Sequence, residues 1–181
     1  FRIGYANKLL AYFENDELAA KVWVEKYALK SSKGKYLEFV PSDMHKRLAT
    51  EFFRIEKKHV ENDKHHKDLS EYGKERKPLN YKKIFNFFNE FKYLIPQGSV
   101  MSNLGATNQF SSLSNCVVLP DVFDSYGGVL FSDQQLAQLF KRRCGVGLDI
   151  SSLRPAHEEV RNSAITTSGA VSFMERFSNT T

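Results

Sequence analysis

Apolar residues recur at helical spacing through the first half of the chain and predict three helices there. Asn15 or Asp16 can cap a helix that runs to about Leu29, and Pro41 opens a second one. Residues 81–93 form a third, aromatic-rich helix. The apolar stripes of the last two helices consist of Met44, Leu48, Phe52 and Ile55, and of Ile84, Phe85, Phe88 and Phe91. The first half therefore indicates a small helical domain, in which such stripes are more typical of packing than of a cofactor site.

The pattern changes near Ile95, where breaker residues replace the helical periodicity. Residues 101–105 are typical of a loop. We therefore expect two domains, one over 1–94 and one over 95–181.

Two short strands and a helix are predicted in the second half. The β-branched run 115–119 predicts a buried strand, and residues 148–150 predict another after a Gly-x-Gly turn. Between them, Ser132 and Gln135 have capping-box spacing and predict a helix that starts at Ser132. A last helix is expected from Ser168 or Gly169 to Phe177. A helix, a glycine-rich turn and a strand in this order predict an α/β barrel or sheet.

The charge of the chain is positive and unevenly placed. Its 26 Lys and Arg residues exceed the 21 Asp and Glu residues, giving a net charge of +5, and most of the basic ones lie in residues 1–95. A basic half invites a nucleic-acid interpretation. The lysines nevertheless alternate with acidic residues, as on a solvated helical surface or a connecting segment, and the polar stretch around 65–78 fits such a connection. We therefore expect no nucleic-acid binding.

Composition excludes several other classes of protein. No apolar run is long enough to span a membrane, and only two cysteines are present, which argues against a disulfide-stapled secreted domain. We expect a cytoplasmic protein. No histidine has metal-ligand spacing to a cysteine or carboxylate, so no metal site is expected. The five histidines are His45, His59, His65, His66 and His157.

Arginines supply candidate chemistry for binding a phosphate. Arg154 and Arg161 lie seven residues apart in a proline-containing loop, where planar guanidinium groups can clamp a phosphate. Lys141 can add a third charge, and Asp124 can accept a hydrogen bond from a ribose hydroxyl. The alternative is that these charges simply face solvent.

Cys116 has two interpretations. A free cysteine on an apolar strand is commonly a small core residue. Because Ser114 and Asn115 beside it are polar, it can instead be a thiol that donates reducing equivalents to a bound substrate. Reduction of a carbon–oxygen bond takes two electrons and therefore needs a second thiol. Cys144 lies in an Arg-Arg-Cys-Gly turn that gives no reason for contact with Cys116, so we expect the second thiol outside this chain.

Several motifs follow one another in a specific order. They are Asp16 to Leu29, the Ser111-Ser112-Leu113-Ser114-Asn115-Cys116 run, Asp124-Ser125, the stretch from Gly145-Val146-Gly147 to Arg154-Pro155, and Ser172 to Phe177. In this order they resemble the N-terminal part of the large, catalytic subunit of ribonucleotide reductase. The resemblance implies an α/β fold with an N-terminal helical domain, followed by the first part of a ten-stranded α/β barrel that is incomplete in this chain. It also implies an oxidoreductase that makes deoxyribonucleotides for DNA replication.

The resemblance assigns roles to individual residues. It implies that Cys116 belongs to a redox-active pair and supplies a hydrogen to C2′ of the substrate as the 2′-hydroxyl leaves as water. The implied substrate contacts are Gly98, Ser99, Ser114, Asn115 and Gly145. The implied contacts to a deoxynucleoside triphosphate effector are Asp124, Ser125, Tyr126, Lys141, Arg154 and Arg161. The family more often has Ser-Pro or Thr-Pro where this chain has Gly98-Ser99.

The resemblance also implies partners and cofactors. A dNTP or ATP effector is expected at a dimer interface formed by the helix from Ser132, and the radical generator is expected to be supplied elsewhere, as a metal-containing small subunit or adenosylcobalamin. Because the radical cysteine of the family has no counterpart here, we expect a second polypeptide to complete the barrel and no activity from this chain alone. The alternative is a non-catalytic remnant that binds nucleotides, dimerises and acts as a regulator.

Overall fold

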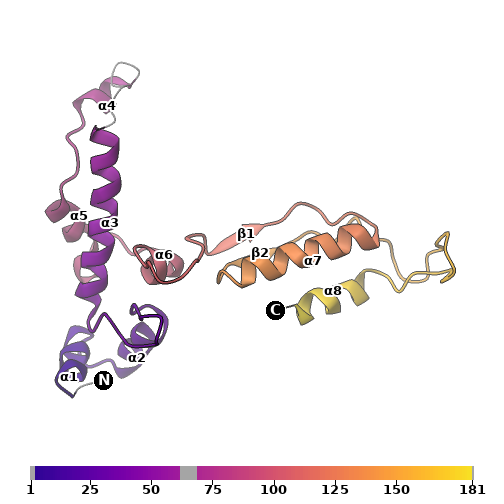
Figure 1. Ribbon diagram of the computed structural model, residues 1–181, viewed down its shortest axis with the longest axis horizontal. Coiled ribbons are helices and arrows are strands. Elements are labelled where there is room, and N and C mark those ends of the chain that lie inside the picture. The colour runs from indigo at the N-terminus through magenta and orange to yellow at the C-terminus, as the bar shows by residue number, and fades with distance from the viewer. Residues whose placement is uncertain (1–2, 62–68, 181) are drawn as a thin grey trace. The chain divides into compact units, whose positions relative to one another are not determined.

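The computed structural model describes residues 3–61 and 69–180, which divide into two compact units (Figure 1). The first unit spans Phe1–Gln109 and the second spans Phe110–Thr181. The domain boundary expected at residues 94 and 95 lies before α6 (Gly98–Asn103), which the structure includes in the first unit. His65 and His66, with the start of the expected connecting segment, lie outside the described residues.

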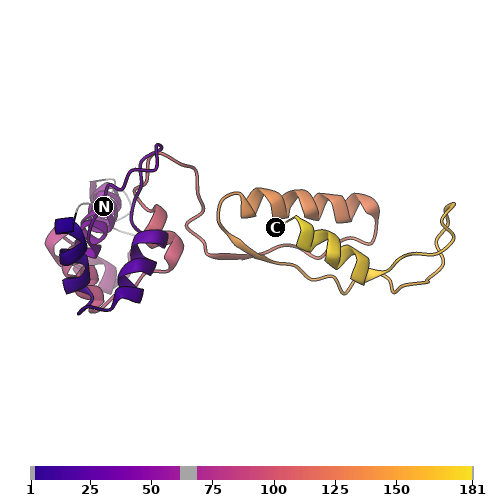
Figure 2. The same cartoon turned by 90° about the horizontal axis from the view of Figure 1, so that it is seen from below.

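The first unit is helical around a core to which α1, α2, α3, α5 and α6 contribute (Figure 2). Its elements are α1 (Ile3–Tyr12), α2 (Glu17–Lys26), α3 (Pro41–Glu61), α4 (Glu71–Glu75), α5 (Tyr81–Phe88), the 3-10 helix η2 (Asn89–Phe91) and α6. Asp16 caps α2 as predicted, because its carboxylate accepts from the Ala19 amide at 2.9 Å. The helix ends at Lys26, before the expected Leu29, and the Leu29 amide donates instead to Glu38.

The apolar stripe of α3 is buried at one end and open at the other. Met44 and Leu48 have no exposed surface, whereas Phe52 and Ile55 are each 37% exposed. Phe52 stacks on Phe88 of α5, with ring centroids 5.5 Å apart. The stripe therefore serves first as core and then as one wall of an open apolar cavity.

The predicted helix 81–93 is interrupted at its middle. Helix α5 ends at Phe88, and the 3-10 turn that follows has Glu90 and Phe91 at φ values of 57° and 54°. Phe91 lies edge-on to His45, with ring centroids 4.7 Å apart. The aromatic face thus reaches the core through a sharp turn and not through a continuous helix.

The prediction of a loop at 101–105 was wrong for Met101–Asn103, which belong to α6. The Arg47 guanidinium donates to the carbonyl of Met101 at 2.7 Å and to that of Leu104. These are carbonyls at the end of the helix, which have no partner within it. A long-range contact therefore stabilises a helix that its local sequence does not favour.

The second unit is built on a β-α-β arrangement, with β1 (Cys116–Val118), α7 (Tyr126–Phe140) and β2 (Gly145–Gly147) followed by α8 (Ala170–Asn179). The two strands are parallel, with Cys116 opposite Gly145 and Val118 opposite Gly147. Figure 1 shows α7 beside the strands and α8 next to α7. The core beneath the helices consists of Leu119, Val122, Val129, Leu136, Leu153 and Phe177. The chain is therefore a helix-rich mixed α/β protein with a small parallel sheet.

Both predicted strands differ from the structure. The first lies where the pattern placed it, but it is not buried, since Val118 is 81% exposed and Cys116 is also exposed. The second strand is the Gly-x-Gly segment itself, Gly145–Gly147, and not residues 148–150. Glycines were taken as a turn before a strand because they have low strand propensity.

The predicted helix start at Ser132 was also wrong. Helix α7 starts at Tyr126, and the Ser125 hydroxyl accepts from the Gly128 amide at 3.0 Å. Ser132 lies inside the helix and is buried. A Cβ at Gly128 would lie 2.3 Å from the carbonyl oxygen of Phe123, so the glycine allows a tight helix entry. The last helix, α8, follows Gly169 as expected.

Among the described residues, none of the helices has the length and apolar composition needed to cross a bilayer.

Candidate functional site

The thiol of Cys116 lies beside a residue without a side chain. Gly145 is its partner in the ladder, and a Cβ built on Gly145 would lie 3.5 Å from the Cys116 sulfur. The Gly145 amide donates to the carbonyl of Asn115 at 2.7 Å, which fixes the spacing of the two backbones. Because Cys116 is exposed and has no side chain next to it at position 145, its sulfur is open to a reactant.

The polar run before Cys116 is held by the end of α7. The Ser112 hydroxyl accepts from the Ser114 amide at 3.0 Å, and the Ser112 amide donates to the carbonyl of Arg142 at 3.2 Å. The Arg142 guanidinium donates back to the carbonyl of Gln138 at 2.7 Å. The backbone at Ser114 is thereby fixed next to the thiol.

The two cysteines lie on opposite faces of the sheet. Residues paired across the ladder share a face, and successive residues alternate between faces. Cys144 directly precedes Gly145, so its side chain is turned away from that of Cys116. Cys144 is only 2% exposed, and both cysteines are free. An internal disulfide would need a rearrangement of the sheet.

A polar cavity of about 720 Å³ lies in the second unit, between the start of α7, α8 and the loop that precedes α8. Five of the six predicted effector residues line it, namely Asp124, Ser125, Tyr126, Arg154 and Arg161. The sixth, Lys141, is not among the lining residues and lies at the C-terminal end of α7. Since α7 has 15 residues, Lys141 is about 22 Å along the helix from Tyr126.

Within this cavity, Asp124 and Arg154 bind each other. The Nε atom of Arg154 donates to Oδ2 of Asp124 at 2.6 Å, and both side chains are about one-third exposed, at 33% and 32%. Sequence reasoning gave Asp124 a ribose contact. In the structure its carboxylate orients the Arg154 guanidinium instead.

An aromatic wall in the cavity was missed by sequence reasoning. Tyr126 and Phe173 meet edge to face with ring centroids 6.1 Å apart, and both line the cavity. Glu159 also lines it, from a bridged pair with Thr166. The spacing of Phe173 to Phe177 at one helical turn was the available signal for an inward-facing aromatic residue.

Gly98 and Ser99 belong to the first unit, at the start of α6. A Cβ at Gly98 would lie 3.2 Å from Cε1 of Tyr27, so the backbone packs closely on that ring. Ser99 is buried. The other predicted substrate contacts, Ser114, Asn115 and Gly145, all belong to the second unit.

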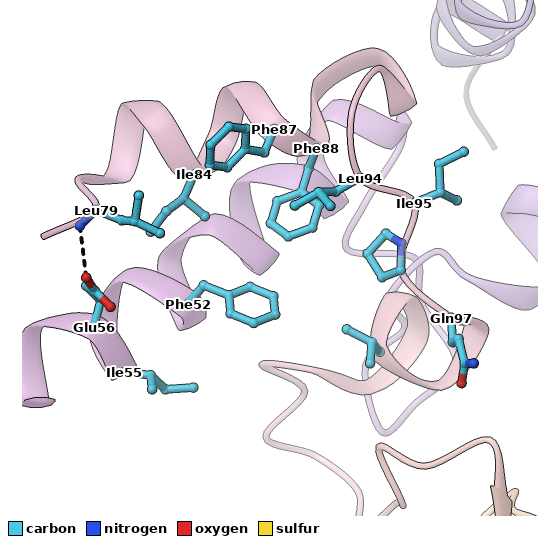
Figure 3. Close-up of a pocket in the computed structure, with 12 residues that line it drawn as sticks. Phe52, Ile55, Glu56, Leu79, Ile84, Phe87, Phe88, Leu94, Ile95 and Gln97 are labelled. Carbon is cyan, nitrogen blue, oxygen red and sulfur yellow. Dashed lines mark hydrogen bonds between the residues drawn. The ribbon is translucent and has the colours of Figure 1, made fainter. Parts of the chain in front are cut away.

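The first unit also has an apolar cavity of about 500 Å³ that sequence reasoning did not predict (Figure 3). Phe52 and Ile55 of α3 face Ile84 and Phe88 of α5 across it. Its acidic lining residue, Glu56, accepts from the Leu79 amide and from Arg76, both at 2.9 Å. The cavity therefore presents apolar carbon and no free carboxylate chemistry.

The described histidines form no metal site. His45 is fully buried, and neither ring nitrogen has a partner among the described residues. Burial lowers the pKa of His45 from 6.5 to about 4. In the part of the chain that the structure describes, no group of three His, Cys, Asp or Glu side chains can hold a metal ion.

Comparison with known families bears on the second unit. Residues 114–181 match the family model described as ribonucleotide reductase, barrel domain. No curated protein sequence matches the chain. The matched residues contain Cys116, Gly145 and the whole lining of the polar cavity. The segment from residue 114 to residue 181 therefore belongs to the ribonucleotide reductase family, as the order of its motifs predicted.

Proposed function

We propose that this chain takes part in the reduction of ribonucleotides to deoxyribonucleotides, with Cys116 as a reducing thiol. The observation that carries the proposal is the open sulfur of Cys116 opposite Gly145, within a segment that matches the barrel domain of the reductase family. Ser114, Asn115 and Gly145 adjoin that sulfur, so we assign them to the substrate.

The chemistry of this step requires a second thiol. Replacement of the 2′-hydroxyl by hydrogen releases water and takes two hydrogen atoms from two thiols, which become a disulfide. Cys116 supplies one of them. Cys144 is buried on the opposite face of the sheet and is unsuited to supply the other. We therefore assign the second thiol to a further polypeptide that completes the barrel.

The radical that starts the reaction is assigned to another component. A metal-containing small subunit or adenosylcobalamin supplies such a radical in this family. Among the described residues no side-chain cluster fits a metal centre, so this chain contributes the reducing thiol and nucleotide contacts.

The polar cavity is proposed to bind a dNTP or ATP effector. Two arginines at one end fit a phosphate chain, and the Ser125 hydroxyl lies at the same cavity. The aromatic pair Tyr126 and Phe173 gives an apolar surface for a base. Lys141 is proposed to reach an effector only across a dimer, because its own cavity lies at the other end of α7.

Helix α7 is proposed as the dimer contact. Leu130 and Phe131 lie in its exposed surface, at 49% and 59% exposure, beside the buried Ser132. Exposed apolar side chains on one helix are typical of an interface. Gly98 and Ser99 are proposed to contact the substrate phosphate, and the protein is proposed to act in the cytoplasm.

The test is turnover by the enzyme purified with all its subunits. Cys116→Ser is expected to abolish deoxyribonucleotide formation while dNTP binding persists, and Cys144→Ala serves as the matched control that keeps turnover. Native mass spectrometry of the same particle is expected to reveal the second polypeptide. Turnover that survives Cys116→Ser would remove the proposed role of this thiol. A wild-type particle that binds dNTP but never turns over would support the regulatory alternative.

A further inference from the structure

We propose that Arg47 is a positioning residue for the Gly98–Ser99 segment, which it holds through the far end of α6. The inference rests on the proposed function, which assigns Gly98 and Ser99 to the substrate. No motif pointed to Arg47, and its role follows from its contacts alone.

Arg47 belongs to a buried ion pair that ties separate segments together. Its Nε atom lies 2.7 Å from Oε1 of Glu38, and the two side chains are 10% and 6% exposed. Glu38 also accepts from the Leu29 amide at 2.9 Å. The pair therefore joins α3 to the segments that follow α2 and precede α3.

The same guanidinium holds the end of α6. Its Nη2 atom donates to the carbonyl of Met101 at 2.7 Å, and Nη1 donates to the carbonyl of Leu104. A cation at a helix C-terminus is favourable, because the last carbonyls carry partial negative charge. Helix α6 has six residues and is too short to be stable by itself. Arg47 therefore determines whether α6 is ordered.

The other end of α6 is fixed by packing. The Gly98 backbone lies against the Tyr27 ring, and the Ser102 hydroxyl donates to the Gly98 carbonyl at 2.9 Å. A helix held at both ends presents the Gly98–Ser99 backbone in one conformation. A ligand that contacts it then bears no cost of ordering the segment.

Gly105 makes room for the Arg47 side chain. It has a φ of +80°, and a Cβ there would lie 2.9 Å from Cγ of Arg47 and 2.9 Å from Cγ of Glu51. Any other residue at this position would push the arginine stem away from α6. Position 105 is thus a second place at which the contact can be tested.

The first test is Arg47→Lys in the enzyme purified with all its subunits. Lysine keeps the charge beside Glu38, but its compact ammonium cannot span the carboxylate and two carbonyls. We expect the KM for the ribonucleotide to rise roughly fivefold with kcat nearly unchanged, as for a lost ground-state contact. Hydrogen exchange of the α6 amides should speed up. Arg54→Lys is the control, since Arg54 lies on the same helix, is 63% exposed and pairs with Glu51.

The second test is Gly105→Asn, which leaves the ion pair chemically intact and tolerates a positive φ. Its control is Gly34→Asn, because Gly34 has a φ of +73° and nothing within 4 Å of a built Cβ. The same rise in KM is expected for Gly105→Asn alone. This pair keeps the proposal open to test if Arg47→Lys does not fold.

Ser99→Gly and Gly98→Ala in the same assay separate two failures. If they change KM but Arg47→Lys and Gly105→Asn do not, the positioning role is overturned and the substrate assignment stands. If α6 loosens in the Arg47 variant while KM stays constant for every variant, the substrate assignment fails, and the positioning role falls with it.

Discussion

Cys116 faces Gly145 across the parallel ladder, and the missing side chain of the glycine leaves the sulfur uncovered. A Cβ at position 145 would lie 3.5 Å from that sulfur, whereas one at Gly147 would meet only Cγ2 of Val118 at 3.9 Å. Both glycines belong to β2 and share a face. They therefore form a matched pair for testing access to the thiol.

Gly145→Val is expected to slow alkylation of Cys116 by iodoacetamide roughly fivefold or more, because the branched side chain covers the sulfur. Gly147→Val should leave the rate within about twofold of the parent. Mass spectrometry of the alkylated peptide measures each rate. Equal rates in both variants would mean that the glycine does not control access.

Loss of Arg154 is expected to weaken dNTP binding at the polar cavity. Arg154→Gln removes a charged donor and should cost about 1.5–3 kcal/mol of binding free energy, measured by calorimetry. Asp124→Asn should cost less, because it leaves the arginine in place but unpaired. Arg176→Gln is the control, since Arg176 forms a similar 2.8 Å pair with Asp133 and does not line the cavity. An unchanged affinity for every deoxynucleotide would exclude Arg154 from the site.

The first unit is expected to lose stability in acid through His45. Burial lowers the pKa of this histidine from 6.5 to about 4, so the unfolded chain binds the proton more readily than the folded one. Its contribution is fully present above about pH 6.5 and is lost as the pH falls to about 4, reaching about 3 kcal/mol. Urea unfolding followed by the fluorescence of Trp23, the single tryptophan, measures the effect.

His45→Leu should make unfolding of this unit less dependent on pH in that range. His59→Leu, at an exposed position of the same helix, should keep the dependence of the parent. Parallel pH profiles for the parent and His45→Leu would contradict the assignment.

Two leucine-sized residues of the same helix should differ strongly in what they contribute to stability. Leu48 is fully buried, and Leu48→Ala is expected to lower the free energy of unfolding by about 2–5 kcal/mol. Ile55 lies at the open apolar cavity, and Ile55→Ala should cost less than about 1 kcal/mol. Urea titration of both variants checks this, and similar losses would show that the outer part of the stripe is also core.

The sequence predicted those elements whose signals are local. Asp16 sits where its carboxylate can reach an amide three residues on, and Pro41 opens a helix through its fixed φ. The order of motifs around Cys116 and Arg154 indicated the family, and the cavity gathers most of the residues that the motifs singled out.

The errors arose where distant residues decide the local structure. Ser132 has the spacing of a helix cap but lies within α7, because Gly127 and Gly128 allow the helix to start earlier. Helix α6 depends on Arg47, more than fifty positions earlier in the chain. The aromatic helix turns at Glu90 so that Phe91 can pack on His45. Composition and spacing carry no information on such contacts.

The opposite orientation of the two thiols has a consequence for handling the protein. With Cys144 enclosed in the fold and no other cysteine in the 181 residues, air oxidation of the folded chain can reach only Cys116. The oxidised product is then a covalent dimer or a mixed disulfide with a small thiol, and not an internally bridged monomer. A non-reducing gel distinguishes these products by their mass, and purification under reductant preserves the free thiol.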